Sequence, residues 1–590
     1  MKQFFKHVFS TLVGNIITLI IAGLFILGFI GIMVASIDST TTYIPPEKSV
    51  LHIYLNQTIP DHANEDPFSG LLTGGSDANA ALGLDKILTC IRRAKSDERI
   101  KGIFLELSEV PSGLATINEL RQAFLDFRKS GKFVYAYSNN YSQRAYYLAT
   151  VADSIYLNPM GGISLTGINA SVMFMKGLLD KIGIKAEVIR HGKYKSAIEP
   201  FTLTKLSDEN RQQITEYITP VWSTMISEIA KSRKLNQAEV QKAVDSLLLF
   251  DGMYALQKGY VHKLLYRDEV TERIKSRTGA TMQSYVTLNN YILSPLSDEE
   301  DRASESDNII ALIFAEGEIR MGNSDEGIIG AETLSKAIES AADDSKVKAI
   351  VLRVNSPGGD ALASELIWRA LEKAKKSKPV IASMGNVAAS GGYYIACGAD
   401  TILASEHTLT GSIGVFGLMF NMQELLNQKL GITFDNVNTG KYADIGKANR
   451  PLSEYERSVI QKRIEHIYDT FLDRVSSGRG MKVGNVDSIA QGRVWIGARA
   501  KEIRLIDAFG GMNDAVVLAA KLSKLSEYRV KVMPKKESIF ERFFTLLNRD
   551  VSIRELAAVS GVSEVMLRHV MMLTSGGTIQ ARLPLDIMLE

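Results

Sequence analysis

The chain has 590 residues, of which 45% are hydrophobic and 23% are charged, a balance that is typical of folded globular proteins and argues against a disordered chain. This length exceeds one ordinary hydrophobic core, so we expect more than one domain. The formal net charge is only +2, so no strong electrostatic field favours nucleic-acid binding. The two cysteines, Cys90 and Cys397, are too few for a disulfide framework or a zinc site, and we interpret them as buried free thiols rather than as a disulfide bridge.

The first predicted element is a membrane-spanning helix. Residues 8–35 are apolar or small apart from four Ser, Thr and Asn residues, carry no charge, and are long enough to cross a hydrocarbon core of ~30 Å. Lys2 and Lys6 precede this segment and no Lys or Arg follows it until Lys48, so the positive-inside rule leaves the short N-terminus in the cytoplasm and the rest outside. A cleaved signal peptide is the alternative, but residues 33–36 offer only a weak cleavage site.

Two long stretches of the chain resemble each other at an offset of about 247 residues. The matched segments are 96–105 with 343–352, 146–149 with 393–396, 165–167 with 409–411, and 192–194 with 440–442. Because these matches keep one order and nearly one offset, we predict two copies of a single domain.

Each copy alternates short β-branched runs with helical patterns. In the second copy we expect buried strands at 309–314, 349–354 and 379–382, and helices at 331–342 and 361–376. Strand–helix alternation is typical of parallel βαβ units, so the predicted fold class is α/β with parallel sheets. A capping box of Ser453 and Glu456 predicts the start of a long helix, whose counterpart in the first copy begins near Ser207.

Polar linkers and a distinct tail divide the chain. We predict an anchor at 1–36, a linker at 37–48, a first α/β repeat at 49–293, an acidic linker at 294–307, a second α/β repeat at 308–534 and a C-terminal tail at 535–590. In the tail, four large apolar residues at helical spacing (Phe540, Phe543, Phe544 and Leu547) indicate an amphipathic segment. It is expected either to lie on a membrane or to pack against the folded body or another subunit.

A serine in the second copy is the candidate nucleophile. Ser390 follows a predicted strand and precedes a predicted helix, so main-chain N–H groups without helical partners surround it and favour an anion. The N–H of Gly391 is one expected oxyanion donor, and that of Gly359, in the glycine turn after the preceding strand, is the second. A simple helix cap at Ser390 and a simple turn at Gly359 are the alternatives.

A serine nucleophile needs a base, and the sequence favours a lysine over a histidine. The chain has 8 histidines, and the two nearest to these segments, His191 and His407, show no supporting pattern. An ordinary lysine has a pKa near ~10.4 and cannot accept a proton at pH 7. Burial disfavours the charged form and can lower that pKa by several units, so a buried lysine can serve as the base.

The duplication indicates which lysine this is. Both copies contain Gly-Lys-Tyr, and the residue two positions after that lysine is Lys195 in the first copy but Ala443 in the second. Conversely, Ser390 in the second copy falls opposite Gln143 in the first. One active site that draws a single residue from each copy explains this asymmetry, whereas two independent sites do not. Random divergence between the copies is the alternative.

These motifs resemble bacterial signal peptide peptidase A in its long, duplicated form. The resemblance rests on GKYKSAIEPF at 192–201 and ASGGYY at 389–394, and it extends over nearly the whole chain. It implies tandem Clp protease/crotonase-like domains behind an N-terminal transmembrane helix, assembled as a homotetramer. It also implies a serine protease in which Ser390 is the nucleophile, Lys195 is the general base and Ser412 orients the lysine.

The resemblance further implies where the chain acts and on what. Its substrates are expected to be signal peptides and other hydrophobic peptides, cleaved at the periplasmic face of the bacterial inner membrane to which the single-pass anchor attaches the protein. No metal or other cofactor and no nucleic acid is expected. The alternatives are an acyl-thioester hydratase or isomerase on the same fold, and a tethered scaffold without activity.

Overall fold

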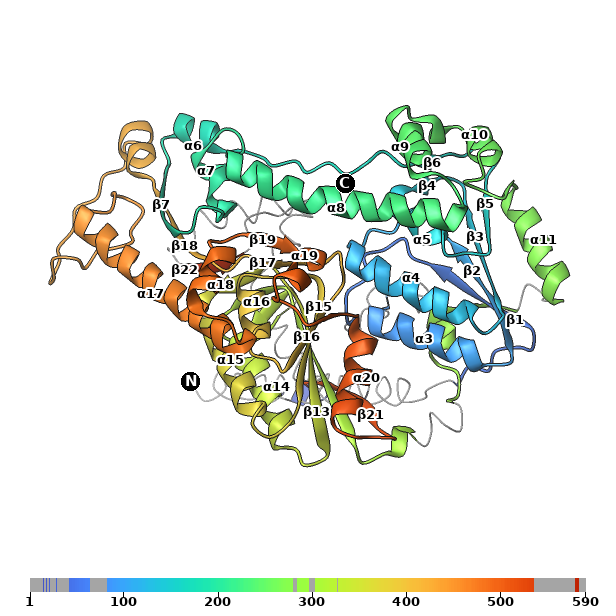
Figure 1. The fold of residues 1–590 in the computed structure, drawn as a ribbon. Helices are drawn as coiled ribbons and strands as arrows, with labels where there is room; N and C mark the ends of the chain where they lie inside the picture. Colours follow the sequence, from blue (N-terminus) through green and yellow to red (C-terminus); the bar gives the residue numbers. More distant parts are fainter. Residues whose placement is uncertain are drawn as a thin grey trace, which may run out of the picture.

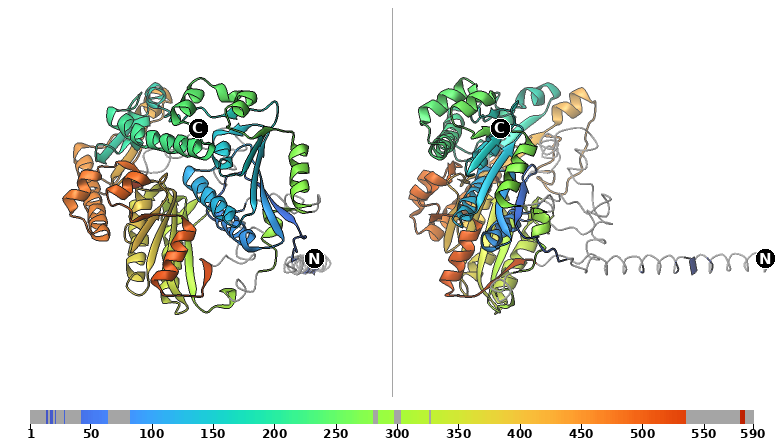
Figure 2. Two further views of the ribbon diagram at one scale, coloured as in Figure 1. Left: turned by 45° about the vertical axis from the view of Figure 1, so that its right-hand side comes forward. Right: turned by 90° about the vertical axis from the view of Figure 1, so that its right-hand side faces the viewer.

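The computed structural model describes the chain between its two ends (Figures 1 and 2). The described residues are 42–63, 82–279, 284–296, 303–325, 327–534 and 579–582, with five isolated positions between 14 and 28. Within these residues, no helix combines the length and the apolar character needed to cross a bilayer. Most of the predicted anchor at 8–35, most of the predicted tail and the centre of the acidic linker lie outside the described residues.

The first copy folds around a six-stranded parallel sheet in the order β8-β5-β3-β2-β1-β9. These strands are β1 (Ser49–Tyr54), β2 (Ile100–Glu106), β3 (Phe133–Ser138), β5 (Ser154–Leu157), β8 (Lys263–Leu264) and β9 (Tyr285–Thr287). Three crossover helices connect the central strands: α3 (Leu84–Ser96), α4 (Leu114–Arg128) and α5 (Gln143–Ala149). Parallel strands require such crossovers, so the predicted βαβ organisation is confirmed for this copy.

The second copy repeats this plan in a larger sheet. Its path is β19-β17-β15-β13-β10-β21, with β16 beside β15 and β20 beside β16, and the β17–β19 pair is antiparallel. The strands are β10 (Ile309–Glu316), β13 (Val347–Ser356), β15 (Val380–Ala389), β16 (Thr401–Ala404), β17 (Leu409–Gly411), β19 (Val494–Ile496), β20 (Ala508–Phe509) and β21 (Arg529–Met533). The crossover helices are α14 (Ala331–Asp343), α15 (Ala361–Ala374) and α16 (Gly391–Ala396). The predicted strands and helices of this copy are therefore confirmed, except that β15 continues to Ala389.

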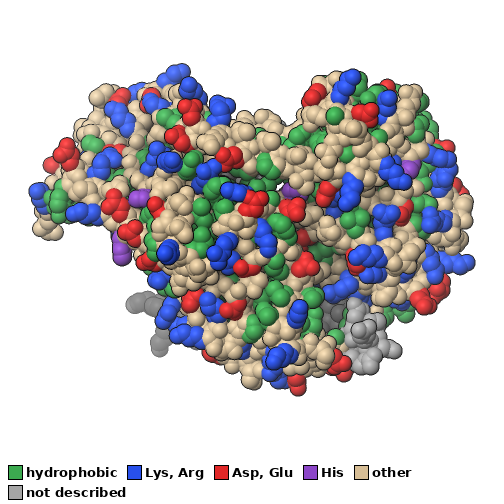
Figure 3. All heavy atoms as spheres, in the orientation of Figure 1, with side chains coloured by type: hydrophobic (Ala, Val, Ile, Leu, Met, Phe, Trp, Pro, Cys, Tyr) green, Lys and Arg blue, Asp and Glu red, His purple; other side chains and the backbone are tan. Residues whose placement is uncertain are grey.

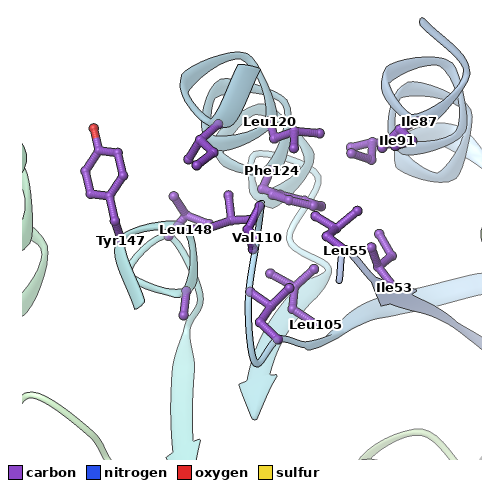
Figure 4. Close-up of a cluster of buried hydrophobic side chains, with 14 of the residues drawn as sticks. Ile53, Leu55, Ile87, Ile91, Leu105, Val110, Leu120, Phe124, Tyr147 and Leu148 are labelled. Carbon is purple, nitrogen blue, oxygen red and sulfur yellow. The ribbon is translucent and has the colours of Figure 1, made fainter. Parts of the chain in front are cut away.

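Each sheet buries apolar side chains beneath its helices, and Figure 4 shows part of the first core. There Leu120 and Phe124 of α4 face Leu55, Leu105 and Val110 from the strand ends, and all five are buried. Full burial of such a side chain contributes roughly 1.5–3 kcal/mol. The core of each copy therefore fixes the strand ends from which the loops of the candidate site emerge.

A third, mixed sheet joins the copies, in the order β12-β11-β14-β22-β18-β7. Its strands are β7 (Lys185–His191), β11 (Glu318–Arg320), β12 (Ile328–Gly330), β14 (Gly358–Asp360), β18 (Val415–Asn421) and β22 (Ile579–Arg582). β7 comes from the first copy and pairs antiparallel with β18 of the second along its whole length. The sequence predicted only a turn at Gly358 and Gly359, but both residues lie in β14, because main-chain pairing with β11 and β22 extends them.

Two long helices flank this joint, as the sequence predicts. α8 (Asp208–Arg233) begins after the cap Ser207 and runs across the top of Figure 1 from β7 toward the first sheet. α17 (Glu454–Arg479) begins with the capping box of Ser453 and Glu456. The remaining elements are β4 (Tyr141–Ser142), β6 (Ile163–Ser164), α6 (Lys176–Ile182), α7 (Glu199–Thr202), α9 (Gln237–Asp245), α10 (Gly252–Gln257), α11 (Arg267–Thr278), α12 (Leu288–Tyr291), α18 (Val483–Ile489), α19 (Gly497–Glu502) and α20 (Met512–Leu522), with single turns at 196–198, 248–250 and 425–429.

A buried cluster of charged side chains also links the copies. On the surface shown in Figure 3, by contrast, acidic and basic side chains are interspersed. Arg353 of β13 is fully buried and donates to Asp61 at 2.8 Å and to Glu119 of α4 at 2.7 Å, both from the first copy. Glu316, at the end of β10, accepts from the main-chain N–H of Asp61. Burial, reinforced by the neighbouring Asp61, raises the pKa of Glu316 to about 7. This cluster fixes the docking of one copy against the other.

Candidate active site

Ser390 stands at the junction of a strand and a helix, as the sequence predicts. β15 ends at Ala389 and α16 begins at Gly391, and the side chain of Ser390 is fully buried between them. Its φ of 55° lies in the left-handed region, which a residue with a Cβ adopts only at a cost in energy. Its main-chain N–H donates to the carbonyl of Gly411 at 2.8 Å, and its carbonyl accepts from Tyr394. These bonds hold the main chain of Ser390 in this conformation.

Lys195 reaches this hydroxyl from the first copy. It lies in the turn after β7, and its Nζ is 2.8 Å from Ser390 Oγ across 195 residues of sequence. The strand pairing of β7 with β18 brings the turn to the second copy. The lysine and the serine that the internal asymmetry singled out are therefore in direct contact. Among the described residues, no histidine hydrogen-bonds to Ser390, and His191 instead stacks on Tyr468.

The surroundings of Lys195 favour its neutral form. The side chain is fully buried, and this loss of solvation lowers the pKa of its ammonium well below the ordinary value. Its other polar neighbours are Ser412 Oγ at 3.0 Å and Ser412 O at 3.2 Å, and the ring of Phe416 lies 6.0 Å away. A hydroxyl and a carbonyl can orient an amine without supplying a counter-charge. The neutral amine is therefore present at a lower pH than in an exposed lysine.

Gly391 and Gly359 are the two predicted oxyanion donors. Gly391 is the first residue of α16, so its N–H has no acceptor inside the helix. Gly359 lies on β14 at a φ of 157°, and a Cβ there would meet the carbonyl oxygen of Ile319 at 2.0 Å. A Cβ on Gly392 would likewise lie 2.6 Å from the carbonyl of Ser356, so α16 packs tightly on the end of β13. The roles of Gly359 and Gly391 as donors remain predictions.

The loop at Gln491 and Gly492, which the sequence did not single out, packs against the turn that carries Lys195. Gly492 has a φ of +79°, and a Cβ on it would lie 2.7 Å from the Cβ of Lys195. Its N–H donates to the carbonyl of Ile413 at 2.8 Å, while the N–H of Tyr194 donates to the carbonyl of Gln491 at 3.0 Å. No local pattern marks this loop, because its partner is almost 300 residues away in the sequence.

In each copy, the position that corresponds to the other copy's dyad residue holds a different residue type. Gln143, opposite Ser390, begins α5, and its amide oxygen accepts from the main-chain N–H groups of Thr166 and Gly167 at 3.1 and 3.0 Å. Ala443, opposite Lys195, is exposed. Across the described ranges, no group of three or more His, Cys, Asp or Glu residues is arranged to hold a metal ion. The contact between Lys195 and Ser390 is thus assembled from both copies.

Known proteins match this chain over most of its length. Residues 126–281 and 372–526 each match the profile of peptidase family S49, so both copies contain a domain of this family. "Protease 4" from Haemophilus influenzae is 34% identical over 84% of this chain and 83% of its own length, and "Protease 4" from Salmonella typhi is 37% identical over 78% and 75%. A "Putative signal peptide peptidase SppA" from Enterococcus faecium is 39% identical over 33% of this chain and 56% of its own.

Proposed function

Because this chain belongs to peptidase family S49 and is therefore a serine protease, we propose that it cleaves peptides with Ser390 as the nucleophile and neutral Lys195 as the general base. The observation that carries this proposal is the buried contact of 2.8 Å between Lys195 Nζ and Ser390 Oγ. The separation lies within the range over which a base can abstract a hydroxyl proton directly.

The reaction follows from the protonation states of these two groups. Lys195 takes the hydroxyl proton while Ser390 Oγ bonds to the scissile carbonyl carbon, whose oxygen becomes an oxyanion. The N–H groups of Gly359 and Gly391 stabilise that charge. The C–N bond then breaks as Lys195 returns its proton to the leaving amine, which leaves an acyl-serine. A water molecule, deprotonated by Lys195, hydrolyses the ester and restores the serine. Ser412 holds the lysine amine in line through both steps.

We propose that substrates bind as an extended strand between β14 and β18. The chain's own β22 supports this mode, since its main chain pairs antiparallel with Gly358–Asp360 of β14 and with Phe416 and Gly417 of β18. Main-chain pairing of this kind binds peptides irrespective of sequence, and side-chain pockets then select among them. Gly359, a proposed oxyanion donor, lies on β14, so a peptide held there passes the reactive serine.

Hydrophobic peptides are the substrate class that fits this site. Ala389, the residue before the serine, belongs to a buried apolar cluster with Leu409, Val494 and Ile496. A dry site is also what keeps Lys195 uncharged, so an apolar substrate that excludes water favours the reactive state. Together with the name of the Enterococcus faecium relative, this supports signal peptides as natural substrates. The corresponding location is the periplasmic face of the bacterial inner membrane, with residues 8–35 as the single-pass anchor.

We further propose that the protein acts as a homotetramer. Residues 431–442 of the second copy match 183–194 of the first by sequence, and the latter contain β7, which covers β18 within the chain. The matching second-copy segment is exposed, with Phe434 at 52% and Val437 at 100%. A ring in which this segment covers the first copy of the next chain would bury both side chains. Light scattering should then give a mass four times 64.9 kDa.

The dyad is tested by replacing each member in the full-length protein. Ser390→Ala and Lys195→Ala should each lower hydrolysis of an apolar peptide by at least about 10²-fold, because a general base alone contributes about 10²–10⁴-fold. Lys193→Ala is the matched control, since this exposed lysine lies two residues away and should leave activity unchanged. A serine-directed fluorophosphonate should label the wild type and not Ser390→Ala. Near-normal activity in Lys195→Ala would refute the lysine as the base.

A further inference from the structure

A buried glutamine outside the dyad touches both halves of the proposed active site. Gln213 lies on α8 in the first copy and is only 2% exposed. Its Nε2 donates to Ser196 Oγ at 3.1 Å and to Asn210 Oδ1 at 3.0 Å. Its Oε1 accepts from the main-chain N–H of Val494, in the second copy, at 3.0 Å. Both ends of one side-chain amide are therefore used, and they are used by different copies.

The orientation of this amide is determined by its partners. A main-chain N–H can only donate, so the atom of Gln213 that meets Val494 must be the oxygen. Nε2 then necessarily points toward the lysine turn. There the hydroxyl of Ser196 donates to Asn210 Oδ1 at 3.0 Å, which leaves its oxygen free to accept from Gln213. Asn210 is held in turn by Glu199, to which its Nδ2 donates at 2.9 Å.

Each end of the amide controls one member of the dyad. Ser196 directly follows Lys195, so the Nε2 end fixes the turn that carries the base. Val494 pairs with Gly411 across β17 and β19, and the carbonyl of Gly411 accepts from the N–H of Ser390. The Oε1 end is therefore one strand away from the nucleophile. A single side chain therefore links the turn of the base to β19, which pairs with the strand that anchors the serine.

We propose that Gln213 is a positioning residue that sets the distance between the Lys195 turn and the β17–β19 pair that anchors Ser390. This inference rests on the proposed function, since it concerns the geometry of the Ser–Lys dyad. The copies also meet through main-chain bonds that no side-chain substitution removes, namely the bond from Tyr194 to Gln491 and the pairing of β7 with β18. Loss of the Gln213 amide should therefore loosen the lysine turn without separating the copies.

The test compares Gln213→Met with Gln212→Met in the full-length protein. Methionine keeps the length of the side chain but neither donates nor accepts a strong hydrogen bond, so the link is lost with little change in volume. Gln212 is the neighbouring residue on α8, and its amide bonds only to the exposed Glu216 among the contacts of the described residues. The measurements are kcat and KM for an apolar peptide, the rate of fluorophosphonate labelling of Ser390, the pH dependence of kcat, and Tm.

In Gln213→Met we expect kcat and the labelling rate to fall about tenfold, with KM within twofold of the wild type, because only the base is displaced. The pH of half-maximal kcat should move upward. A looser turn admits water to Lys195, which favours the charged form and raises the pH at which the amine becomes neutral. Gln212→Met should match the wild type in all four measurements.

Two results would overturn the inference. One is a Gln213→Met protein with a lower Tm that, assayed well below that Tm, keeps the kcat and the pH midpoint of the wild type. The other applies if Gln213→Met does not fold: Gln213→Glu keeps the acceptor for Val494 and loses the donor to Ser196, and wild-type kinetics in that variant would be equally contrary. Failure of the dyad itself is recognised separately, because Lys195→Ala would then remain active whatever Gln213 does.

Discussion

The contact between Gly492 and Lys195 predicts a large effect from a single methyl group. In Gly492→Ala the added Cβ would lie 2.7 Å from the Cβ of Lys195 and 2.8 Å from its main-chain nitrogen. Carbon atoms in non-bonded contact prefer about 3.5–4.0 Å, so the lysine turn or the loop must move by roughly 1 Å. The dyad separation of 2.8 Å would then exceed hydrogen-bond range.

A displacement of this size at a catalytic group can reduce the rate about 10²-fold, and this is the loss of kcat that we expect in Gly492→Ala. The backbone adds a separate cost, because alanine at a φ of +79° is disfavoured by about 1 kcal/mol. Gly446→Ala isolates that cost, since Gly446 has a φ of +81° and a Cβ there would meet no atom within 4 Å. Hydrolysis of an apolar peptide and Tm should be measured for both variants. Equal activities in the two would refute the assignment of a steric role to this contact.

Three further predictions concern the contacts between the copies and the proposed substrate position between β14 and β18. Arg353→Met should lower the free energy of unfolding by about 3–5 kcal/mol in denaturant titrations, because Asp61 and Glu119 lose their buried counter-charge. Glu316 has a pKa of about 7 in the folded state, above its ordinary value of 4.5, so the folded state binds more protons than the unfolded state between these pH values. The free energy of unfolding should therefore fall as pH rises from 4.5 to about 7. Glu316→Gln should flatten this pH dependence, and an unchanged slope would contradict the prediction. If β22 occupies the proposed substrate position between β14 and β18 most of the time, a chain ending at Thr578, which lacks β22, should cleave a short peptide at least ~2-fold faster. Equal rates would show that β22 does not compete with the peptide.

The sequence was sufficient to predict the parts of the fold that depend on local or repeated patterns. Continuous apolar runs predict the strands β10, β13 and β15, since parallel strands covered on both faces need no alternation. The capping box of Ser453 and Glu456 predicts the start of α17, because its bonds lie within one turn. The offset between the copies led to Lys195 and Ser390, since the duplication supplies an internal comparison.

What the sequence could not supply depends on contacts between distant segments. Gln213 is one polar residue on a helix with several, and its importance comes from Val494, which is 281 residues away. Gly492 is one of many glycines, and only the approach of Lys195 gives it a role. The placement of β22 between β14 and β18 has no counterpart in the tail's amphipathic pattern, because main-chain pairing leaves no compositional trace.

The pairing of β7 with β18 determines when in its synthesis this chain can first break a peptide bond. A ribosome that has delivered the lysine must still add 195 residues to reach the serine, and about a hundred more to complete the loop that seats the amine. Until then the nascent chain holds the proposed base without the proposed nucleophile. The division of the proposed dyad between the two copies thus separates the synthesis of its members by nearly the length of one repeat.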